Sequence, residues 1–192
     1  MRTINSYYAI VSVAVSLRIA WLIGELLHRR RYRQSTSKEL DKHSGAAWDI
    51  ANLLEPFGSV IALAGVGRFG SPTLCQSVGL FLMLGGVVIR FLAMRTLGRY
   101  FTSLVTVRSD HQIVSSGLYK YMRHPAYTGA LLAHLGLGLA FGSWVSMSFS
   151  VLPFFFAAWY RIKVEEKVLL ESFGIDYSYY ASRTARLIPK IF

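Results

Sequence analysis

The amino-acid sequence predicts an all-α polytopic membrane protein, in which residues 1–192 form a single domain that crosses the bilayer five times. Composition is the first observation behind this prediction: 53% of the residues are hydrophobic and 16% are charged, whereas soluble domains have about 25% charged residues. The second is that apolar residues gather in stretches close to the roughly 20 residues that a helix needs to cross the bilayer core. A soluble fold is therefore not expected.

Five apolar stretches are the expected transmembrane helices. They run over residues 4–27, 47–66, 74–94, 127–141 and 145–160. Only Gly142, Ser143 and Trp144 separate the last two stretches, which predicts a tight helical hairpin. The final helix should project out of the membrane, because residues 161–173 keep a helical spacing until Gly174, a typical C-cap residue.

The distribution of positive charge predicts how the chain is oriented in the membrane. Seventeen of the 21 Lys and Arg residues lie in residues 28–43, 95–123 and 161–192, so all three segments should share the cytoplasmic side. The N-terminus is then outside and the C-terminus cytoplasmic, which five spans satisfy. Cleavage of the first span as a signal peptide is disfavoured, because the basic run at residues 28–33 would be left outside. Membrane topology thus accounts for the net charge of +11 without nucleic acid as a partner.

Two motifs that elsewhere indicate a ligand or a crosslink do not do so in this sequence. Gly65, Gly67 and Gly70 match the dinucleotide fingerprint G-x-G-x-x-G, but a membrane span precedes them and the next acidic residue is Asp110. We interpret these glycines as a loop. Cys75 is the only cysteine, so one chain contains no disulfide and no cysteine-based metal site.

Functional side chains concentrate in residues 95–127 and 159–190, whereas residues 1–94 read as scaffold. The first block contains SDHQIVSSGLYKYMRHPAYTG and the second RIKVEEKVLLESFGIDYSYYASRTARLIP. The order of the elements SGLY, RHPAYTG, Arg-x-x-x-Glu, FG, YxxY and Arg-x-x-Pro resembles the isoprenylcysteine carboxyl methyltransferase family over residues 95–190. Five spans would make this chain a minimal, prokaryotic member.

The resemblance implies a cytoplasmic pocket for S-adenosyl-L-methionine, released as S-adenosyl-L-homocysteine, that the C-terminal half builds and its last segment closes. The residues implied to bind the cofactor are His111, Gln112, Ile113, Val114, Tyr119, His124, Pro125, Ala126, Tyr127 and Glu165. A glutamine that the family carries further upstream has no clear equivalent here, and Val107 is the nearest candidate. No metal is expected.

The residue types of this set suit such a cofactor. A tyrosine ring can stack on the adenine base or lie against the sulfonium cation, a contact worth about 0.5 to 2 kcal/mol. A carboxylate such as that of Glu165 suits the amino group or the ribose hydroxyls. The competing interpretation is that Tyr119 and Tyr127 belong to the aromatic belt of the membrane interface. His124 could likewise be only the polar residue before a helix that starts at Pro125.

Arg161 is the expected catalytic residue and would clamp the methyl acceptor. It lies four residues before Glu165, on the same face of the last long helix. A carboxylate acceptor, with a pKa of roughly 3.5, is already ionised and needs no general base. A guanidinium can hold it bidentately and align one oxygen for in-line attack on the methyl group. The alternative is that Arg161 extends outward to lipid phosphates.

The sequence therefore predicts a carboxyl O-methyltransferase of the cell membrane in a prokaryote, or of the endoplasmic reticulum in a eukaryote. Its expected partners are a prenylated cysteine, or another lipidic carboxylate, and membrane lipids. The alternatives are a phospholipid N-methyltransferase, an NADPH-dependent sterol-type reductase and a non-catalytic membrane scaffold. An amine acceptor would gain nothing from Arg161, and sterol-type reductases are normally much longer.

The charged residues inside the expected spans need internal partners, because a charge facing lipid is costly. These residues are Arg18, Glu25, Glu55 and Arg90. We expect them to serve packing and not catalysis. His134, alone on an apolar face, is expected to be a packed helix residue and not a metal ligand.

Overall fold

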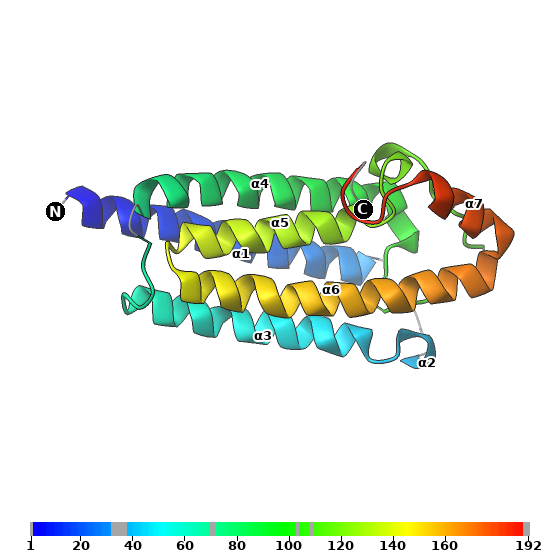
Figure 1. Cartoon of the computed structure of the whole chain (residues 1–192), viewed down its shortest axis with the longest axis horizontal. Helices are drawn as coiled ribbons and strands as arrows, with labels where there is room; N and C mark the ends of the chain where they lie inside the picture. Colours follow the sequence, from blue (N-terminus) through cyan, green and yellow to red (C-terminus); the bar gives the residue numbers. More distant parts are fainter. Residues whose placement is uncertain (1, 32–37, 70–71, 103, 108–109, 190–192) are drawn as a thin grey trace.

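Five long helices lie side by side along the molecule, and short elements cover one end of them (Figure 1). The computed structural model describes residues 2–31, 38–69, 72–102, 104–107 and 110–189. The long helices are α1 (Arg2–Arg31), α3 (Ser44–Leu63), α4 (Pro72–Leu97), α5 (Pro125–Ala140) and α6 (Trp144–Phe173). The short ones are α2 (Lys38–Asp41), α7 (Ile175–Arg183) and the 3-10 helices η1 (Gly98–Tyr100) and η2 (Gly117–Lys120). The predicted all-α class is confirmed.

Three segments of the described chain are long and apolar enough to cross a membrane: Ser6–His28, Leu74–Tyr100 and Trp144–Phe173. The stretches expected at 47–66 and 127–141 also form helices, as α3 and α5, but neither meets this criterion. The 16 residues of α5 extend about 24 Å at 1.5 Å per residue, less than the roughly 30 Å bilayer core. Integral membrane character is thus supported, and the fivefold crossing stays a prediction.

The hairpin and the long final helix form as predicted. Gly142 turns the chain with a φ of +63°, and the Ser143 hydroxyl accepts hydrogen bonds from the first backbone N–H groups of α6, at 3.2 Å from Val145 and 3.4 Å from Ser146. The helix then continues to Phe173, and Gly174 follows it with a φ of +52°. The extension carries Arg161 and Glu165 beyond the middle of the bundle.

The described parts of the three basic segments meet at the same end of the bundle, beside α7, whereas the N-terminus lies at the opposite end (Figure 1). The glycine-rich loop also lies at the opposite end, where the Trp144 N–H donates to the Gly67 carbonyl at 2.9 Å. Gly65 and Gly67 have φ values of +88° and +69°, so both take turn conformations, as expected of a loop. Gly70 lies outside the described residues.

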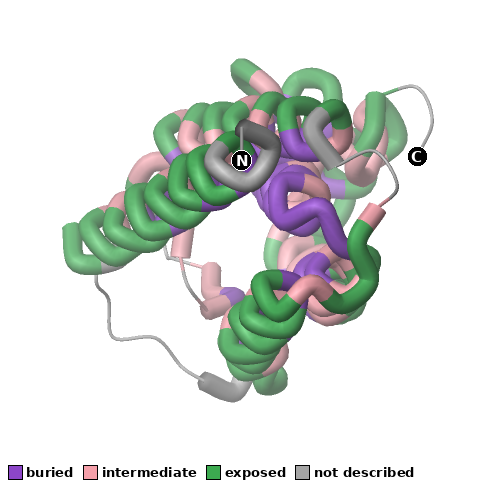
Figure 2. Tube along the Cα trace, turned by 90° about the vertical axis from the view of Figure 1, so that its left-hand side faces the viewer, coloured by how far each residue is buried: buried purple, intermediate pink, exposed green. Residues whose placement is uncertain are grey.

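Helices α4 and α5 pack backbone against backbone. A Cβ atom added to Gly86 would lie closer than 3.0 Å to the Ala133 nitrogen and the Gly129 oxygen, and one added to Gly136 would meet the backbone of Met83 equally closely. Buried residues gather in the interior of the bundle (Figure 2), and ten of them belong to α5. Glycine is therefore required where these two helices cross.

The charged residues of the long helices pair inside the bundle, as predicted. Arg18 donates to Glu55 at 2.8 Å, and Arg90 donates to Glu25 at 2.8 Å. His134 is fully buried, with its ring stacked on Phe154 at a centroid distance of 3.4 Å. Because both ion pairs join different helices, they tie α1 to α3 and α1 to α4.

Replacing Gly86 by Ala should destabilise the protein, because the new methyl group has no room against α5. Overpacking of this kind costs about 1 to 3 kcal/mol. The matched control is Gly85→Ala on the same helix, where the described residues leave the space within 4 Å of an added Cβ empty. Thermal or denaturant unfolding in detergent micelles measures the difference, and equal stability of the two variants would contradict the backbone packing.

Candidate functional site

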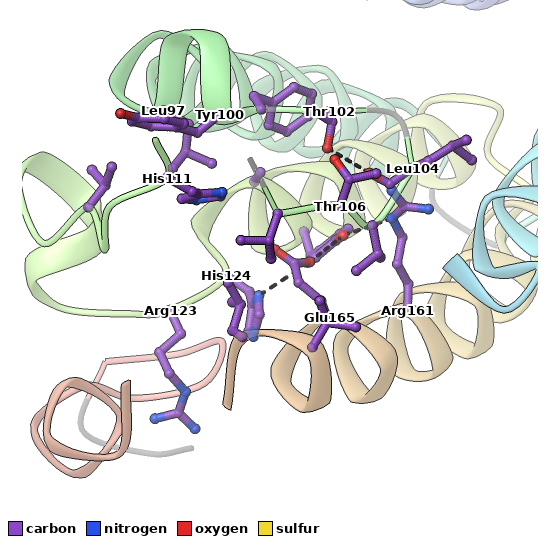
Figure 3. Close-up of a pocket in the computed structure, with 18 of the residues that line it drawn as sticks. Leu97, Tyr100, Thr102, Leu104, Thr106, His111, Arg123, His124, Arg161 and Glu165 are labelled. Atoms are coloured by element: carbon purple, nitrogen blue, oxygen red, sulfur yellow. Dashed lines mark hydrogen bonds and ion pairs between the residues drawn. The ribbon is translucent and has the colours of Figure 1, made fainter. Parts of the chain in front are cut away.

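A pocket opens at the α7 end of the bundle (Figure 3). Its walls come from the start of α3, the end of α4, the segment between η1 and η2, the first turn of α5, the extended part of α6, and α7. The wall is mainly aromatic and aliphatic, with a small number of charged groups directed inward. Such a mixture is typical of a site for an organic ligand.

Nearly all of the predicted site residues line this single pocket. From the predicted set these are His111, Gln112, Ile113, Val114, Tyr119, His124, Ala126, Tyr127, Arg161 and Glu165. Val107, the candidate for the upstream position, lines it as well. Pro125 is the exception: it is fully buried in the first turn of α5, where its fixed φ suits the start of a helix. The two sequence blocks thus fold together.

The start of α5 determines how the side chains of its first turn are directed. The His124 carbonyl accepts hydrogen bonds from the N–H groups of Tyr127 and Thr128, both at 3.1 Å, so the helix begins directly after His124. His124 and Tyr127 then face α6 with their ring centroids 5.6 Å apart. The His124 side chain is 2% exposed, which makes it an interior residue as well as a helix-start residue.

The Tyr127 hydroxyl joins the two charged residues of α6. It donates to Glu165 Oε2 at 2.8 Å and accepts from Arg161 Nε at 2.9 Å. One turn of α6 separates Arg161 from Glu165, so both face Tyr127. This hydrogen-bonded chain fixes a cation and a carboxylate side by side in the pocket wall.

A second carboxylate lies on the other side of Arg161. The carboxylate is that of Asp41, whose Oδ1 atom is 3.3 Å from Arg161 Nη1. The same Nη1 group donates to Ser44 Oγ at 3.3 Å. Asp41 also accepts the backbone N–H groups of Gly45 and Val105, each at 2.8 Å. Burial raises the pKa of the Asp41 carboxyl, but these hydrogen bonds and the Arg161 charge outweigh burial and lower it below its usual range. Asp41 is therefore ionised at neutral pH.

Arg161 is directed into the protein. Its side chain is 7% exposed, and its described partners Asp41, Ser44 and Tyr127 are all interior groups. The outward, lipid-facing orientation considered from the sequence is not the one that the structure adopts. The guanidinium can therefore meet a ligand within the pocket.

A C-terminal strap, defined as residues 184–189, lies beside the segment that precedes α5. The Arg123 N–H donates to the Ala185 carbonyl at 2.8 Å, and the His124 N–H donates to the Arg186 carbonyl at 3.1 Å. The Ala185 N–H returns a bond to the Tyr121 carbonyl at 3.2 Å. The strap is thus held against the segment that carries Arg123 and His124, two residues of the pocket wall.

Glu166 fastens this strap to α6. Its carboxylate is 2.9 Å from Arg123 Nε, 2.9 Å from Arg186 Nη2 and 3.2 Å from His124 Nε2. Glu165 and Glu166 are adjacent in sequence but about 100° apart around the helix, so one faces the pocket and the other faces the strap. Sequence reasoning did not single out Glu166, although two adjacent acids between Lys163 and Lys167 were a visible signal.

Aromatic rings line the side of the pocket opposite Arg161. His111 stacks on Tyr100 at a centroid distance of 4.6 Å and meets the edge of Phe173 at 5.5 Å. The Tyr180 hydroxyl donates to the Tyr119 carbonyl at 2.8 Å and holds α7 against η2. Burial raises the pKa of Tyr119 well above its usual value, so this phenol is neutral at physiological pH.

Two buried hydroxyls in the pocket wall have no hydrogen-bond partner among the described residues. They are Thr106 Oγ1 and Tyr177 Oη. Tyr177 is 5% exposed, so water does not readily satisfy its hydroxyl. A buried polar group without a partner costs free energy. Both hydroxyls therefore suit a polar ligand that would complete them.

The N-terminal part of the chain contributes more to the pocket than the sequence predicted. Gly45, Trp48 and Asp49 of α3 line it, as does Arg90 of α4. These positions fall within residues 1–94, which were expected to be scaffold and were not among the predicted site residues. The signal that was available is the acid of Asp41 just ahead of a helix start, a pattern that usually indicates capping alone.

Fold and site together define a helical integral membrane protein with a ligand pocket at one end of its bundle. A model of the isoprenylcysteine carboxyl methyltransferase family matches residues 78–171. The chain is 33% identical to protein-S-isoprenylcysteine O-methyltransferase A of Arabidopsis thaliana over 172 residues, which cover 88% of this chain and 85% of that one. It is 35% identical to the Saccharomyces cerevisiae protein-S-isoprenylcysteine O-methyltransferase over 124 residues, 62% and 50% of the two chains.

A solved structure has the same fold. It is that of the eukaryotic intramembrane Ras methyltransferase, which matches with a TM-score of 0.75 and 23% identity over 97% of this chain and 68% of that one. Together with the sequence relatives, this structural match means that the identification rests on sequence as well as on fold. The chain belongs to the isoprenylcysteine carboxyl methyltransferase family.

Substituting Glu166 by Gln should loosen the C-terminal strap, because the carboxylate loses its charge toward Arg123 and Arg186. Trypsin should then cleave after Arg183 or Arg186 at least several-fold faster than in the unsubstituted protein. Glu171→Gln, an exposed acid of the same helix, is the matched control and should leave cleavage unchanged. Equal cleavage of both variants would mean that Glu166 does not hold the strap.

Proposed function

We propose that this protein is an S-adenosylmethionine-dependent carboxyl O-methyltransferase. Its acceptor is a membrane-embedded lipidic carboxylate, foremost the C-terminal isoprenylcysteine of a prenylated protein. The observation that carries the proposal is the chain in which Tyr127 joins Arg161 to Glu165 inside one pocket. The relatives at 33% and 35% identity bear the name of this activity, which supports the same acceptor.

The pocket has the groups that S-adenosyl-L-methionine requires. The stacked rings of Tyr100 and His111 and the aliphatic wall of Ile113 and Val114 suit its adenosyl part, and Glu165 suits its amino group or ribose. The hydroxyls of Thr106 and Tyr177, which lack a hydrogen-bond partner in the described part of the chain, offer two further hydrogen bonds. When bound, this cofactor supplies an electrophilic methyl group on a sulfonium, and it is released as S-adenosyl-L-homocysteine.

The protein's part in the reaction is to position an acceptor that is already nucleophilic. A terminal carboxyl has a pKa of about 3.5 and is ionised at neutral pH, so no residue has to remove a proton. Arg161 holds the carboxylate through its guanidinium and aims one oxygen at the methyl group. Tyr177 and Tyr180 of α7, which line the pocket, limit the access of water.

Arg161 also distinguishes the candidate acceptors. A phospholipid amine would have to lose a proton before attack, and while protonated it cannot accept a hydrogen bond from the guanidinium, whereas a carboxylate can. The environment of Arg161 is thus suited to carboxylate methylation and unsuited to N-methylation of an aminophospholipid.

The proposed membrane arrangement has five spans, with α3 and α5 completing the three long apolar helices. The N-terminus is outside, and the pocket and C-terminus face the cytoplasm. The gathering of the basic segments at the pocket end supports this orientation (Figure 1). The soluble cofactor then enters from the cytosol and the lipid tail from the bilayer, in the cell membrane of a prokaryote or the endoplasmic reticulum of a eukaryote.

The central experiment measures methyl transfer from radiolabelled S-adenosylmethionine to N-acetyl-S-farnesyl-L-cysteine. Arg161→Ala should lower turnover by about 100-fold, because positioning is lost, while the Kd for S-adenosylhomocysteine changes by no more than about threefold. Glu165→Ala should instead raise that Kd by about tenfold or more, because a charge-assisted hydrogen bond to the ligand is lost.

The control for both variants is Glu171→Gln, which removes an exposed charge on the same helix. Normal kinetics in the Arg161 and Glu165 variants would overturn the site. Transfer to phosphatidylethanolamine but not to the farnesylcysteine would overturn the acceptor.

Tyr177→Phe should weaken S-adenosylhomocysteine binding by about 3- to 10-fold, the range of one hydrogen bond worth about 0.5 to 1.5 kcal/mol. The unliganded protein should be no less stable, because the hydroxyl has no partner there among the described residues. Tyr179→Phe, whose side chain is largely exposed, is the control. Calorimetric titration measures both affinities, and an unchanged Kd for Tyr177→Phe would remove this hydroxyl from the site.

A further inference from the structure

A buried carboxylate from the N-terminal half of the chain lies against Arg161, which lines the pocket. Asp41 ends α2 and is 2% exposed. Its Oδ1 atom is 3.3 Å from Arg161 Nη1, on the edge of the guanidinium that Tyr127 does not contact. The residue lies outside the segment matched by the family model, residues 78–171.

Arg161 needs this partner because it is itself buried. Burying a guanidinium without a counter-ion is costly because the charge loses its hydration, and long basic side chains otherwise extend toward water or headgroups. Asp41 supplies an opposite charge in direct contact with the guanidinium, whereas Glu165 is joined to it through the Tyr127 hydroxyl. The Ser44 hydroxyl bridges the pair, since it donates to Asp41 Oδ1 at 2.9 Å and accepts from Arg161 Nη1 at 3.3 Å.

Asp41 is fixed and is not a stand-in for the acceptor carboxylate. It accepts four hydrogen bonds, from the N–H groups of Gly45 and Val105, the Ser44 hydroxyl and Arg161. Three of these donors do not depend on Arg161, so they hold the carboxylate in place whether or not an acceptor is bound. An arriving acceptor would therefore find the guanidinium oriented and would have no need to displace Asp41.

We propose that Asp41, assisted by Ser44, is a positioning residue for the methyl acceptor. It holds Arg161 inward and fixes the plane of its guanidinium between Asp41 and Tyr127. This inference rests on the proposed function and deepens it: the N-terminal helices contribute to acceptor binding, whereas the cofactor is held by the C-terminal half. The consequence that distinguishes this role is selective: loss of Asp41 should weaken binding of the acceptor and leave binding of the cofactor unchanged.

The test is Asp41→Asn in the full-length protein, assayed with N-acetyl-S-farnesyl-L-cysteine and S-adenosylmethionine. The KM for the acceptor should rise by about tenfold, with kcat lowered, while the Kd for S-adenosylhomocysteine stays within about twofold. Ser44→Ala removes only the bridging hydroxyl and leaves the Val105 bond intact, so it should raise the acceptor KM by about threefold. Asp176→Asn, an exposed acid in the first turn of α7, is the control.

A double-mutant cycle separates positioning from general support of the fold. With S-adenosylhomocysteine bound, Asp41→Asn should weaken binding of the farnesylcysteine in the unsubstituted protein but add nothing in an Arg161→Ala background. A role in folding alone would lower the stability and the affinity for both ligands equally in either background.

Three results would overturn the inference. The first is an acceptor KM that both Asp41→Asn and Ser44→Ala leave unchanged, and Ser44→Ala alone decides the matter if Asp41→Asn does not fold. The second is tighter acceptor binding in Asp41→Asn, which would make Asp41 a competitor. The third is an unsubstituted protein that methylates no farnesylcysteine, which removes the proposed function itself and this inference with it.

Discussion

The charge of one buried arginine constrains how the pocket end of the bundle is built. Arg161 is 6% exposed, and a guanidinium in that position is tolerated only if neighbouring groups satisfy its charge and its donors. Asp41, Ser44 and Tyr127 do so, and they come from segments as much as 120 residues away along the chain. The junction of α2 and α3, the start of α5 and the middle of α6 must therefore meet at one place.

The rest of the bundle keeps those helix ends in register. The glycines of α4 and α5 allow backbone contact along their length, which leaves little freedom for either helix to slide. Arg90 links this packing to the site, because it is paired with Glu25 and also donates to the Ala126 carbonyl at 3.1 Å in the first turn of α5. The hydrogen bond from Arg90 to the Ala126 carbonyl thus helps to orient the first turn of α5, which carries Tyr127.

The adjacent residues Glu165 and Glu166 of α6 have different roles. Glu165 faces the pocket and accepts the Tyr127 hydroxyl, whereas Glu166 faces the strap and gathers Arg123, Arg186 and His124. The rotation of about 100° per helical residue is the physical reason for this division. A single helix therefore supplies a side chain to the pocket wall and also holds the C-terminal strap.

The sequence by itself determined the helical class and the approximate helix boundaries, because apolar runs and breakers are local signals. Its short motifs, through their resemblance to a known family, implied ten of the residues that line the pocket. The i, i+4 spacing of Arg161 and Glu165 was likewise enough to place them on one face of α6. Only the tertiary structure decided that Tyr127 joins them, that Asp41 lies against Arg161, and that Pro125 is buried outside the pocket wall. Those outcomes depend on which helix ends pack together. Asp41 and Arg161 are far apart in the sequence, so no local sequence pattern predicts their contact.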